Sequence, residues 1–365
     1  MNPEDGFFYC FGCQIHGDIF DFWMAYHGVG FREALEALAE MAHVQLDDDQ
    51  RSPADVRKEK ERCDMRRQVL KMYQFAQEHF RKNLTSPAGA VCRDYLQARG
   101  VQEDLQARFG LGWAMDDWHD LTGALDRAGF DMKLVAEAGL VGISHSSGKP
   151  YDPFRARLMF PIRDSAGDTI AFGGRIIDNV AGQAKYVNTS DSIVYKKGEH
   201  LYGLDLAGQS MRRTKRAFVT EGYMDVLTMH QFGFENVVAG LGTALTDRQV
   251  KRVMGYAPEI VLVYDGDGPG HKAAMAAAGK ILARGAKAEV LLLPEGEDID
   301  SFLRKQGPNA FRDLLAQAVP GLQFCADVLQ DKAPDLNAPE MELQALRESV
   351  NEWFSQRRFQ HGRSA

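Results

Sequence analysis

Five carboxylates in the second half of the chain follow predicted strands, where acidic side chains commonly bind metal. In chain order they are Glu221, Asp265, Asp267, Asp298 and Asp300. In an open sheet of parallel strands, ligands bind beyond the carboxyl ends of the strands, so we expect these side chains to share one cleft. Like charges in a cleft repel unless a divalent cation bridges them, and carboxylate oxygens select Mg²⁺ or Mn²⁺. Such a cation neutralises phosphate and holds an attacking and a leaving oxygen in line.

A simpler interpretation of Asp265–Gly268 is an ordinary turn, because Asp and Gly both favour turns. Three acidic strand ends in one segment favour the metal site over this interpretation. The segment Gly266–Gly270 also resembles a dinucleotide-binding loop. It lacks the last glycine of that motif, and Asp267 would repel a pyrophosphate, so we reject this second interpretation.

Strands and helices alternate around these acids. The alternation predicts a mixed α/β fold built on a parallel sheet with helices on both faces. The predicted strands are 217–220, 236–239, 260–264 and 288–293, and the predicted helices are 224–232, 247–254 and 272–284.

Upstream of this sheet, residues 157–162 and 169–174 read as paired strands about a turn, followed by a long loop over 178–197. A basic helix is predicted over 56–80, and everything after residue 310 is predicted to be helical. The predicted domains are a partial zinc ribbon (1–46), a linker (47–66), a basic α+β subdomain (67–215), the sheet subdomain (216–305) and a helical segment (306–365).

The composition is that of a globular protein, with 365 residues, 45% hydrophobic and 26% charged. No apolar run reaches the ~18 residues of a membrane span, and the start of the chain lacks the features of a signal peptide. Five cysteines, an odd number, favour a reducing compartment, so we expect a cytoplasmic protein.

The distribution of charge indicates a polyanionic partner. The net charge of −8 argues against nucleic acid for the chain as a whole. However, residues 51–99 carry 12 basic against 6 acidic side chains, and residues 151–216 carry 11 against 7. This segregation suits an enzyme that binds both polyanions and cations.

Three acidic motifs resemble those of the Toprim fold, which primases, topoisomerases and some nucleases share. They are Glu221–Asp225, Tyr264–Asp267 and Glu297–Asp300. In their longer forms they are similar to bacterial DnaG-type primases, and the resemblance extends from about Phe8 to Lys305. It includes Arg157–Arg163, Phe172–Arg175, Lys185–Asn188, Lys197–Gly198 and Leu201–Leu204.

The resemblance implies template-directed synthesis of short RNA primers on single-stranded DNA from ribonucleoside triphosphates. It implies that the five acids bind Mg²⁺ or Mn²⁺, with Glu221, Asp265 and Asp267 at the catalytic centre. It also implies a set of template- and nucleotide-binding residues, which we call the basic wall: Arg157, Arg175, Lys185, Asn188 and Lys197.

Two alternatives remain open at this point. One is a Toprim nuclease or a topoisomerase-like enzyme, although no motif with a nucleophilic tyrosine accompanies the acids and a nuclease would not need the basic wall. The other is a non-catalytic DNA-binding fragment of a primase. A phage-type fusion to a helicase is excluded because the sequence contains no Gly-x-x-x-x-Gly-Lys-Ser/Thr loop.

Cys10 and Cys13 follow an aromatic strand and resemble the second half of a primase zinc ribbon. Structural zinc takes four ligands, and the family's first pair would lie upstream of Met1. Either the chain is truncated, which we favour because the supporting strand and helices are intact, or the site has been lost. We therefore expect partial zinc binding. Only about 45 residues follow Pro320, so most of the family's contact with the replicative helicase is expected to be missing or reduced.

Overall fold

The computed structural model describes residues 7–9, 16–27, 30–44, 53–144, 146–178, 182–242 and 244–332. The chain divides into two units, residues 1–63 and 64–365. No helix in the ranges given above is long and apolar enough to cross a membrane.

The first unit contains a two-stranded antiparallel ladder and two short helices. β1 (Phe8–Tyr9) pairs with β2 (His16–Gly17), and α1 (Ile19–His27) and α2 (Phe31–Met41) follow. The Asp18 carboxylate starts α1 by accepting hydrogen bonds from the backbone N–H groups of Phe20 and Asp21. The aromatic strand before Cys10 and the helices expected to support the ribbon are confirmed.

The basic helix is longer than predicted. α3 spans Pro53–Thr85, so residues 53–66 of the predicted linker are helical. Proline is well tolerated in the first turn of a helix, and the charged run that reads as a linker is compatible with helix, as the Arg57–Glu61 ion pair between successive turns shows. Farther along, α3 buries Tyr73 and Phe80 in the core of the second unit.

The second unit begins with a set of short helices around an antiparallel sheet. The sheet has the strand order β3-β6-β7-β8. Its helical elements are α4 (Ala90–Ala98), α5 (Glu103–Phe109), α6 (Asp120–Arg127), α7 (Met132–Glu137), η1 (Pro87–Gly89) and η2 (Lys197–Glu199). Its strands are β3 (Gly112–Ala114), β6 (Arg157–Arg163), β7 (Thr169–Ile176) and β8 (Tyr186–Asn188), beside the small β4–β5 pair (Gly142–Ile143 and Pro150–Tyr151).

Pairing of β6 with β7 confirms the two strands predicted there. The predicted loop over 178–197 is wrong in one part, because β8 lies within it. β8 has only three residues, all half-buried, and it is an edge strand that pairs with residues 173–175 of β7. A strand this short has too few residues to show an alternating apolar pattern.

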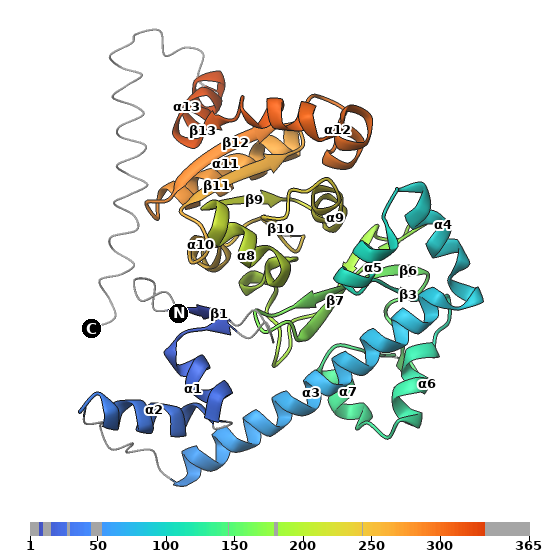
Figure 1. Ribbon diagram of the computed structural model, residues 1–365. Helices are drawn as coiled ribbons and strands as arrows, with labels where there is room; N and C mark the ends of the chain where they lie inside the picture. Colours follow the sequence, from blue (N-terminus) through green and yellow to red (C-terminus); the bar gives the residue numbers. More distant parts are fainter. Residues whose placement is uncertain are drawn as a thin grey trace. The chain divides into compact units, whose positions relative to one another are not determined.

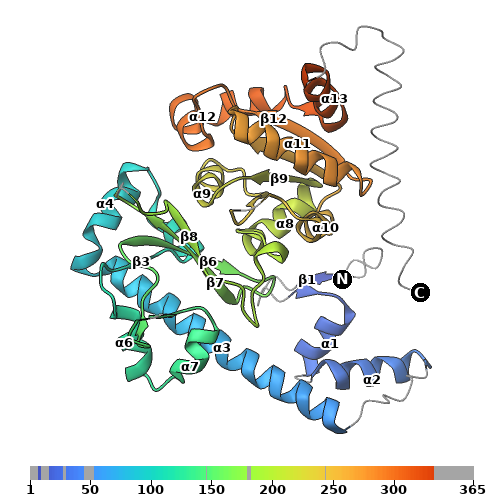
Figure 2. The same cartoon turned by 180° about the vertical axis from the view of Figure 1, so that it is seen from behind.

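The second sheet confirms the predicted mixed α/β fold (Figures 1 and 2). Its order is β10-β9-β11-β12-β13, with the first four strands parallel and β13 antiparallel. Its strands are β9 (Arg216–Thr220), β10 (Val237–Ala239), β11 (Glu259–Tyr264), β12 (Lys287–Leu292) and β13 (Val319–Pro320). Its helices are α8 (Leu204–Thr214), α9 (Tyr223–Gln231), α10 (Asp247–Met254), α11 (Gly268–Leu282), α12 (Ile299–Leu315) and α13 (Gly321–Lys332).

Alternate side chains of the parallel strands enter two apolar clusters, one on each face. Val261 and Val263 pack with residues of α9 and α12, while Ile260 and Leu262 pack with residues of α8, α10 and α11. Helices therefore cover both faces of the sheet, as predicted. The prediction of helix throughout the region after residue 310 is wrong at β13, which adds two residues to the edge of the sheet.

The two sheets of the second unit share one apolar core. Residues from β6 and β7, such as Phe160 and Phe172, belong to the same buried cluster as Tyr223 of α9 and Val261 of β11. An isolated bridge between Tyr202 and Ala239 also joins the segment before α8 to β10. This packing fixes the basic subdomain beside the ends of the parallel strands.

Candidate active site

Strand register brings three acidic strand ends to one edge of the sheet. β11 pairs in parallel with β9 and β12, with Leu262 opposite Val219 and Tyr264 opposite Leu292. Glu221 therefore follows the end of β9 at the same edge where Asp265 follows β11. Asp298 comes after the turn that leaves β12.

The carboxylates at this edge act on one another electrostatically. Burial and the charges of Asp265 and Asp267 raise the pKa of Glu221. Burial and the charges of Asp298 and Asp267 raise the pKa of Asp265, and the positive charge of Lys185 opposes this rise. Four of the five predicted acids therefore act on one another. We call them the acidic cluster: Glu221, Asp265, Asp267 and Asp298.

Asp225 is a further member of this acidic cluster and is absent from the predicted set. It lies in the first turn of α9, where its carboxylate accepts a hydrogen bond of 3.0 Å from the Gly222 N–H. Burial, with the charges of Asp265 and Asp298, raises the pKa of Asp225 to about 8. The sequence carries one signal for Asp225, which is its spacing from Glu221. A residue four positions after Glu221 falls in the first turn of the helix that follows the strand end.

Two of the predicted acids also cap helices. Asp267 accepts a hydrogen bond of 2.7 Å from the Gly270 N–H at the start of α11, and Asp298 accepts one of 2.7 Å from the Ser301 N–H at the start of α12. The turn interpretation of Asp267 thus describes part of its role. Each capping bond occupies one carboxylate oxygen and orients the other.

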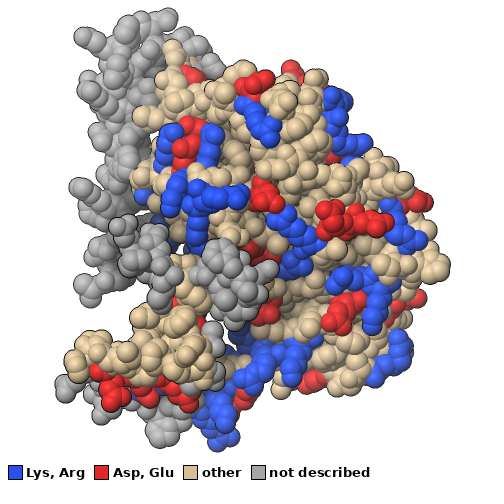
Figure 3. Space-filling view, in the orientation of Figure 1, with Lys and Arg blue, Asp and Glu red and all other residues tan. Residues whose placement is uncertain are grey.

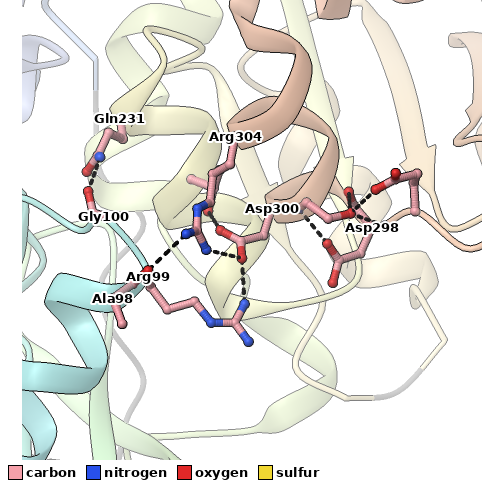
Figure 4. Close-up of polar contacts among 10 residues, drawn as sticks. Ala98, Arg99, Gly100, Gln231, Asp298, Asp300 and Arg304 are labelled. Atoms are coloured by element: carbon pink, nitrogen blue, oxygen red, sulfur yellow. Dashed lines mark hydrogen bonds and ion pairs between the residues drawn. The ribbon is translucent and has the colours of Figure 1, made fainter.

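Asp300 has different surroundings from the other four acids. Its side chain is buried, with 4% of the residue exposed, and it accepts a hydrogen bond from Thr228 and pairs with Arg99 and Arg304 (Figure 4). Its negative charge is thus balanced by two guanidinium groups.

The acidic cluster fits a divalent cation in its chemistry. All its donors are carboxylate oxygens, which are the ligands Mg²⁺ and Mn²⁺ prefer. A cation would relieve the repulsion that, together with burial, raises the pKa values of Glu221, Asp225 and Asp265. Among the residues that the structure describes, no three His, Cys, Asp or Glu side chains are already grouped as a metal site. Cys10 and Cys13 lie outside the described residues.

Two arginines of the basic wall are buried. Arg157 of β6 donates to the carbonyl oxygens of Gly174 and Lys185 at 3.4 and 3.3 Å. Arg175 of β7 is 7% exposed, and its guanidinium lies 4.9 Å from the ring centre of Tyr95 and 5.8 Å from that of Tyr186. Nε and Nη1 of Arg175 have no hydrogen-bond partner among the described residues.

The two lysines of the basic wall and Asn188 differ in their partners. In the part of the chain the structure describes, no ion pair with a carboxylate involves Lys185 or Lys197. The Asn188 amide donates to the Leu241 carbonyl at 2.9 Å and accepts from the Tyr223 hydroxyl at 2.5 Å. Asn188 therefore joins β8 to the parallel sheet, and the lysines are available to anions.

Comparison with known families covers most of the chain. Residues 79–208 match the model of the DNA primase catalytic core, N-terminal domain. Residues 218–303 match the Toprim-like model, and residues 1–54 match the CHC2 zinc finger.

Curated relatives are DNA primases. The chain is 38% identical over 315 residues to the DNA primase of Pseudomonas putida, covering 85% of this chain and 47% of the relative. It is 36% identical over 334 residues to that of Deinococcus radiodurans, covering 91% of this chain and 55% of the relative. The chain thus spans about half the length of the curated relatives it matches.

Solved structures of primase catalytic domains share the fold. The DnaG primase catalytic domain bound to ssDNA superposes with a TM-score of 0.72 at 31% identity, covering 80% of this chain and 94% of that one. A DNA primase domain from Pseudomonas aeruginosa gives 0.70 at 35% identity, covering 79% and 96%. With the acidic strand ends and the basic side chains beside them, these similarities show that the chain belongs to the DnaG-type DNA primase family.

Proposed function

We propose that this chain is a primase core that joins ribonucleotides on a single-stranded DNA template and releases pyrophosphate. The observation that carries the proposal is the meeting of opposite charges at one edge of the parallel sheet. There, the negative charges of acids from three strand ends act on one another. The positive charge of Lys185, which directly precedes β8, opposes the rise in the pKa of Asp265. A nucleotidyl transferase needs both signs, because it holds a polyphosphate and a cation together.

Each side of the site has its own role. Mg²⁺ or Mn²⁺ bound by the acidic cluster would neutralise the triphosphate and its leaving group; we assign its ligands to Glu221, Asp225, Asp265, Asp267 and Asp298. Lys185, Lys197 and Arg175 bind phosphates of the template and the nucleotide. Arg157 and Asn188 hold β6, β7 and β8 so that these cations face the acids.

The other proposed ligands follow from the family. Cys10 and Cys13 supply two of the four ligands that a structural zinc takes, which the match to the CHC2 zinc finger supports. The related catalytic domain was solved bound to ssDNA, and we propose the same partner here together with ribonucleoside triphosphates. We also propose a cytoplasmic location, which the similarity to DNA primases of Pseudomonas putida and Deinococcus radiodurans supports.

A template-directed assay tests the proposal. The chain is incubated with single-stranded DNA, four ribonucleoside triphosphates and Mg²⁺ or Mn²⁺, with Glu221→Gln as a variant of nearly unchanged shape. We expect RNA complementary to the template from the parent chain and at least ~100-fold less from Glu221→Gln, since the lost charge serves the transition state. Cleavage of the template would support the nuclease alternative instead. DNA binding without synthesis in the folded parent would support the non-catalytic one.

A further inference from the structure

Asp300 is a buried carboxylate whose two oxygens are already engaged. One oxygen, Oδ1, accepts a hydrogen bond of 2.9 Å from the Thr228 hydroxyl of α9. The other, Oδ2, lies 2.5 Å from Nη1 of Arg99 and 3.7 Å from Nη1 of Arg304 (Figure 4). A carboxylate with these partners has little capacity left for a metal ion, although it lies only two residues after Asp298.

The partners of Asp300 join two parts of the second unit. Arg99 belongs to residues 98–102, which run from the last residue of α4 to the start of α5 and which we call the 98–102 loop. Arg304 of α12 also donates to the Ala98 carbonyl at 2.9 Å. Gln231 of α9 donates to the Gly100 carbonyl, and its own carbonyl accepts from the Gln102 N–H at 3.1 Å. The 98–102 loop is therefore fastened to α9 and α12 at both of its ends (Figure 4).

The same loop leads to the basic wall. Arg99 lies 5.5 Å from the ring centre of Tyr95, one helical turn earlier on α4. Arg175 of the basic wall lies 4.9 Å from the same ring and 5.8 Å from that of Tyr186, which is adjacent to Lys185 in the sequence. A shift of the 98–102 loop would therefore be passed to Arg175 through the shared tyrosine.

We infer that Asp300 is a positioning residue: paired with Arg99, it fixes the 98–102 loop to α12 and so sets where Arg175 stands relative to the acidic cluster. The charge of Asp298, two residues earlier, acts on Asp225 and Asp265, and we assign this residue to the cation. The two aspartates of this motif thus have separate roles. This assignment rests on the proposed primer synthesis only for its kinetic measurement.

Metal binding separates the two roles. The variants are Asp300→Asn, Arg99→Gln and their double variant, with Asp298→Asn as the matched control because asparagine still caps α12. Mn²⁺ binding is followed by electron paramagnetic resonance. We expect Asp298→Asn to weaken Mn²⁺ binding at least tenfold, and Asp300→Asn and Arg99→Gln to leave it within twofold of the parent. If Asp300→Asn weakens Mn²⁺ binding as Asp298→Asn does while Arg99→Gln does not, Asp300 is a ligand and the inference is overturned.

Kinetics and melting then test the pairing itself. Asp300→Asn and Arg99→Gln should each raise the KM for ribonucleoside triphosphates by several-fold, with a smaller change in kcat, and the double variant should be no worse than the poorer single variant. Simple multiplication of the two KM effects would contradict a shared role. The same cycle in melting temperature needs no activity, so an inactive parent would contradict the proposed function without touching the pairing. If either variant fails to fold, Arg304→Gln, which removes the more distant partner, takes its place in the cycle.

Discussion

At the residue scale, the candidate site is a group of charged side chains that act on one another electrostatically. The acids at the strand ends repel one another, and this repulsion together with burial raises the pKa values of Glu221, Asp225 and Asp265. Lysines nearby have no carboxylate partner among the described residues. Without a cation, this repulsion lowers the stability of the fold at the strand ends. Charged groups with shifted pKa values are common at functional sites.

The raised pKa of Asp225 predicts a pH-dependent stability in the absence of metal. Its pKa is about 8 in the folded chain and near 4 when unfolded, so the folded state holds the extra proton between these values. Stability then falls as the pH rises from about 4 to about 8. The melting temperature of Asp225→Asn should rise relative to the parent's between pH 5 and pH 8.5, by at least ~2–4 °C, since one pKa unit corresponds to about 1.4 kcal/mol.

Melting curves in a chelator from pH 5 to 9 provide the measurement. The control is Asp116→Asn, which removes an exposed carboxylate outside the acidic cluster and should leave the curve unchanged. Parallel curves for the parent and Asp225→Asn would show that Asp225 does not hold this proton.

Lys185 and Lys197, whose charges form no ion pair among the described residues, predict a change in the salt dependence of DNA binding. Lys185→Ala and Lys197→Ala should each weaken binding to single-stranded DNA and lower the log–log salt slope by about 0.7 for one lost phosphate contact. Lys196→Ala is the matched control, because Lys196 is exposed and lies 3.8 Å from the Glu199 carboxylate. The measurement is a binding titration at several salt concentrations. If all three variants keep the parent slope, the two lysines do not contact phosphate.

At the scale of elements, the acids depend on how closely β11 and β12 approach beyond their ends. A Cβ on Gly266, between Asp265 and Asp267, would stand 2.1 Å from the Leu293 carbonyl oxygen. Since that atom is backbone, Gly266→Ala must push the two strand ends apart, at a cost of about 1–3 kcal/mol.

Gly266→Ala should therefore lower the melting temperature, by about 2–4 °C per kcal/mol, and weaken Mn²⁺ binding. Gly268→Ala is the natural control. It lies two residues away at the start of α11, and a Cβ there would meet nothing within 4 Å. Equal melting temperatures and equal Mn²⁺ affinities for the two variants would show that this close approach does not matter.

A contact between α10 and η2 holds Lys197 in place. Gln249 of α10 is fully buried, and its amide donates to the carbonyls of Lys197 and His200 at 3.2 and 2.7 Å. Gln249→Ala leaves these acceptors unpaired, which costs about 1–3 kcal/mol for each buried group. It should lower the melting temperature and weaken nucleotide binding, as we also expect Lys197→Ala to weaken it, whereas Gln317→Ala, at an exposed site, should do neither. Nucleotide binding at the parent's affinity in Gln249→Ala would exclude this positioning role.

At the scale of the whole molecule, the sequence predicted elements that have a clear local pattern. It did not predict contacts between residues that lie far apart in the chain. The strands before Glu221 and Asp265 are short apolar runs that end in acid and glycine, so their type and their shared edge followed from the sequence. β8 and β13 were missed because two- and three-residue edge strands exist only through the neighbour they pair with. The surroundings of Asp300 were missed for the same reason, since Arg99 lies 201 residues away.

The charge pattern shows the same limit. Basic and acidic segments separate along the chain, but on the face drawn in Figure 3 lysines and arginines are interspersed with aspartates and glutamates. Folding brings segments of opposite sign together, and the interaction of Lys185 with Asp265 is one case. The domain boundaries predicted from the sequence remain predictions.

We propose that the acidic cluster and the basic wall form one site for a cation and a triphosphate together. The most direct test is the affinity for a ribonucleoside triphosphate, measured by calorimetry with and without Mn²⁺ in the parent, Asp265→Asn and Lys185→Ala. A cation and a triphosphate held side by side attract each other, so each should tighten the binding of the other. We expect Mn²⁺ to tighten nucleotide binding at least tenfold in the parent. Asp265→Asn should lose most of this gain, and Lys185→Ala should bind nucleotide more weakly both with and without Mn²⁺. The same gain in Asp265→Asn as in the parent, or no gain in the parent, would contradict the proposal of one shared site.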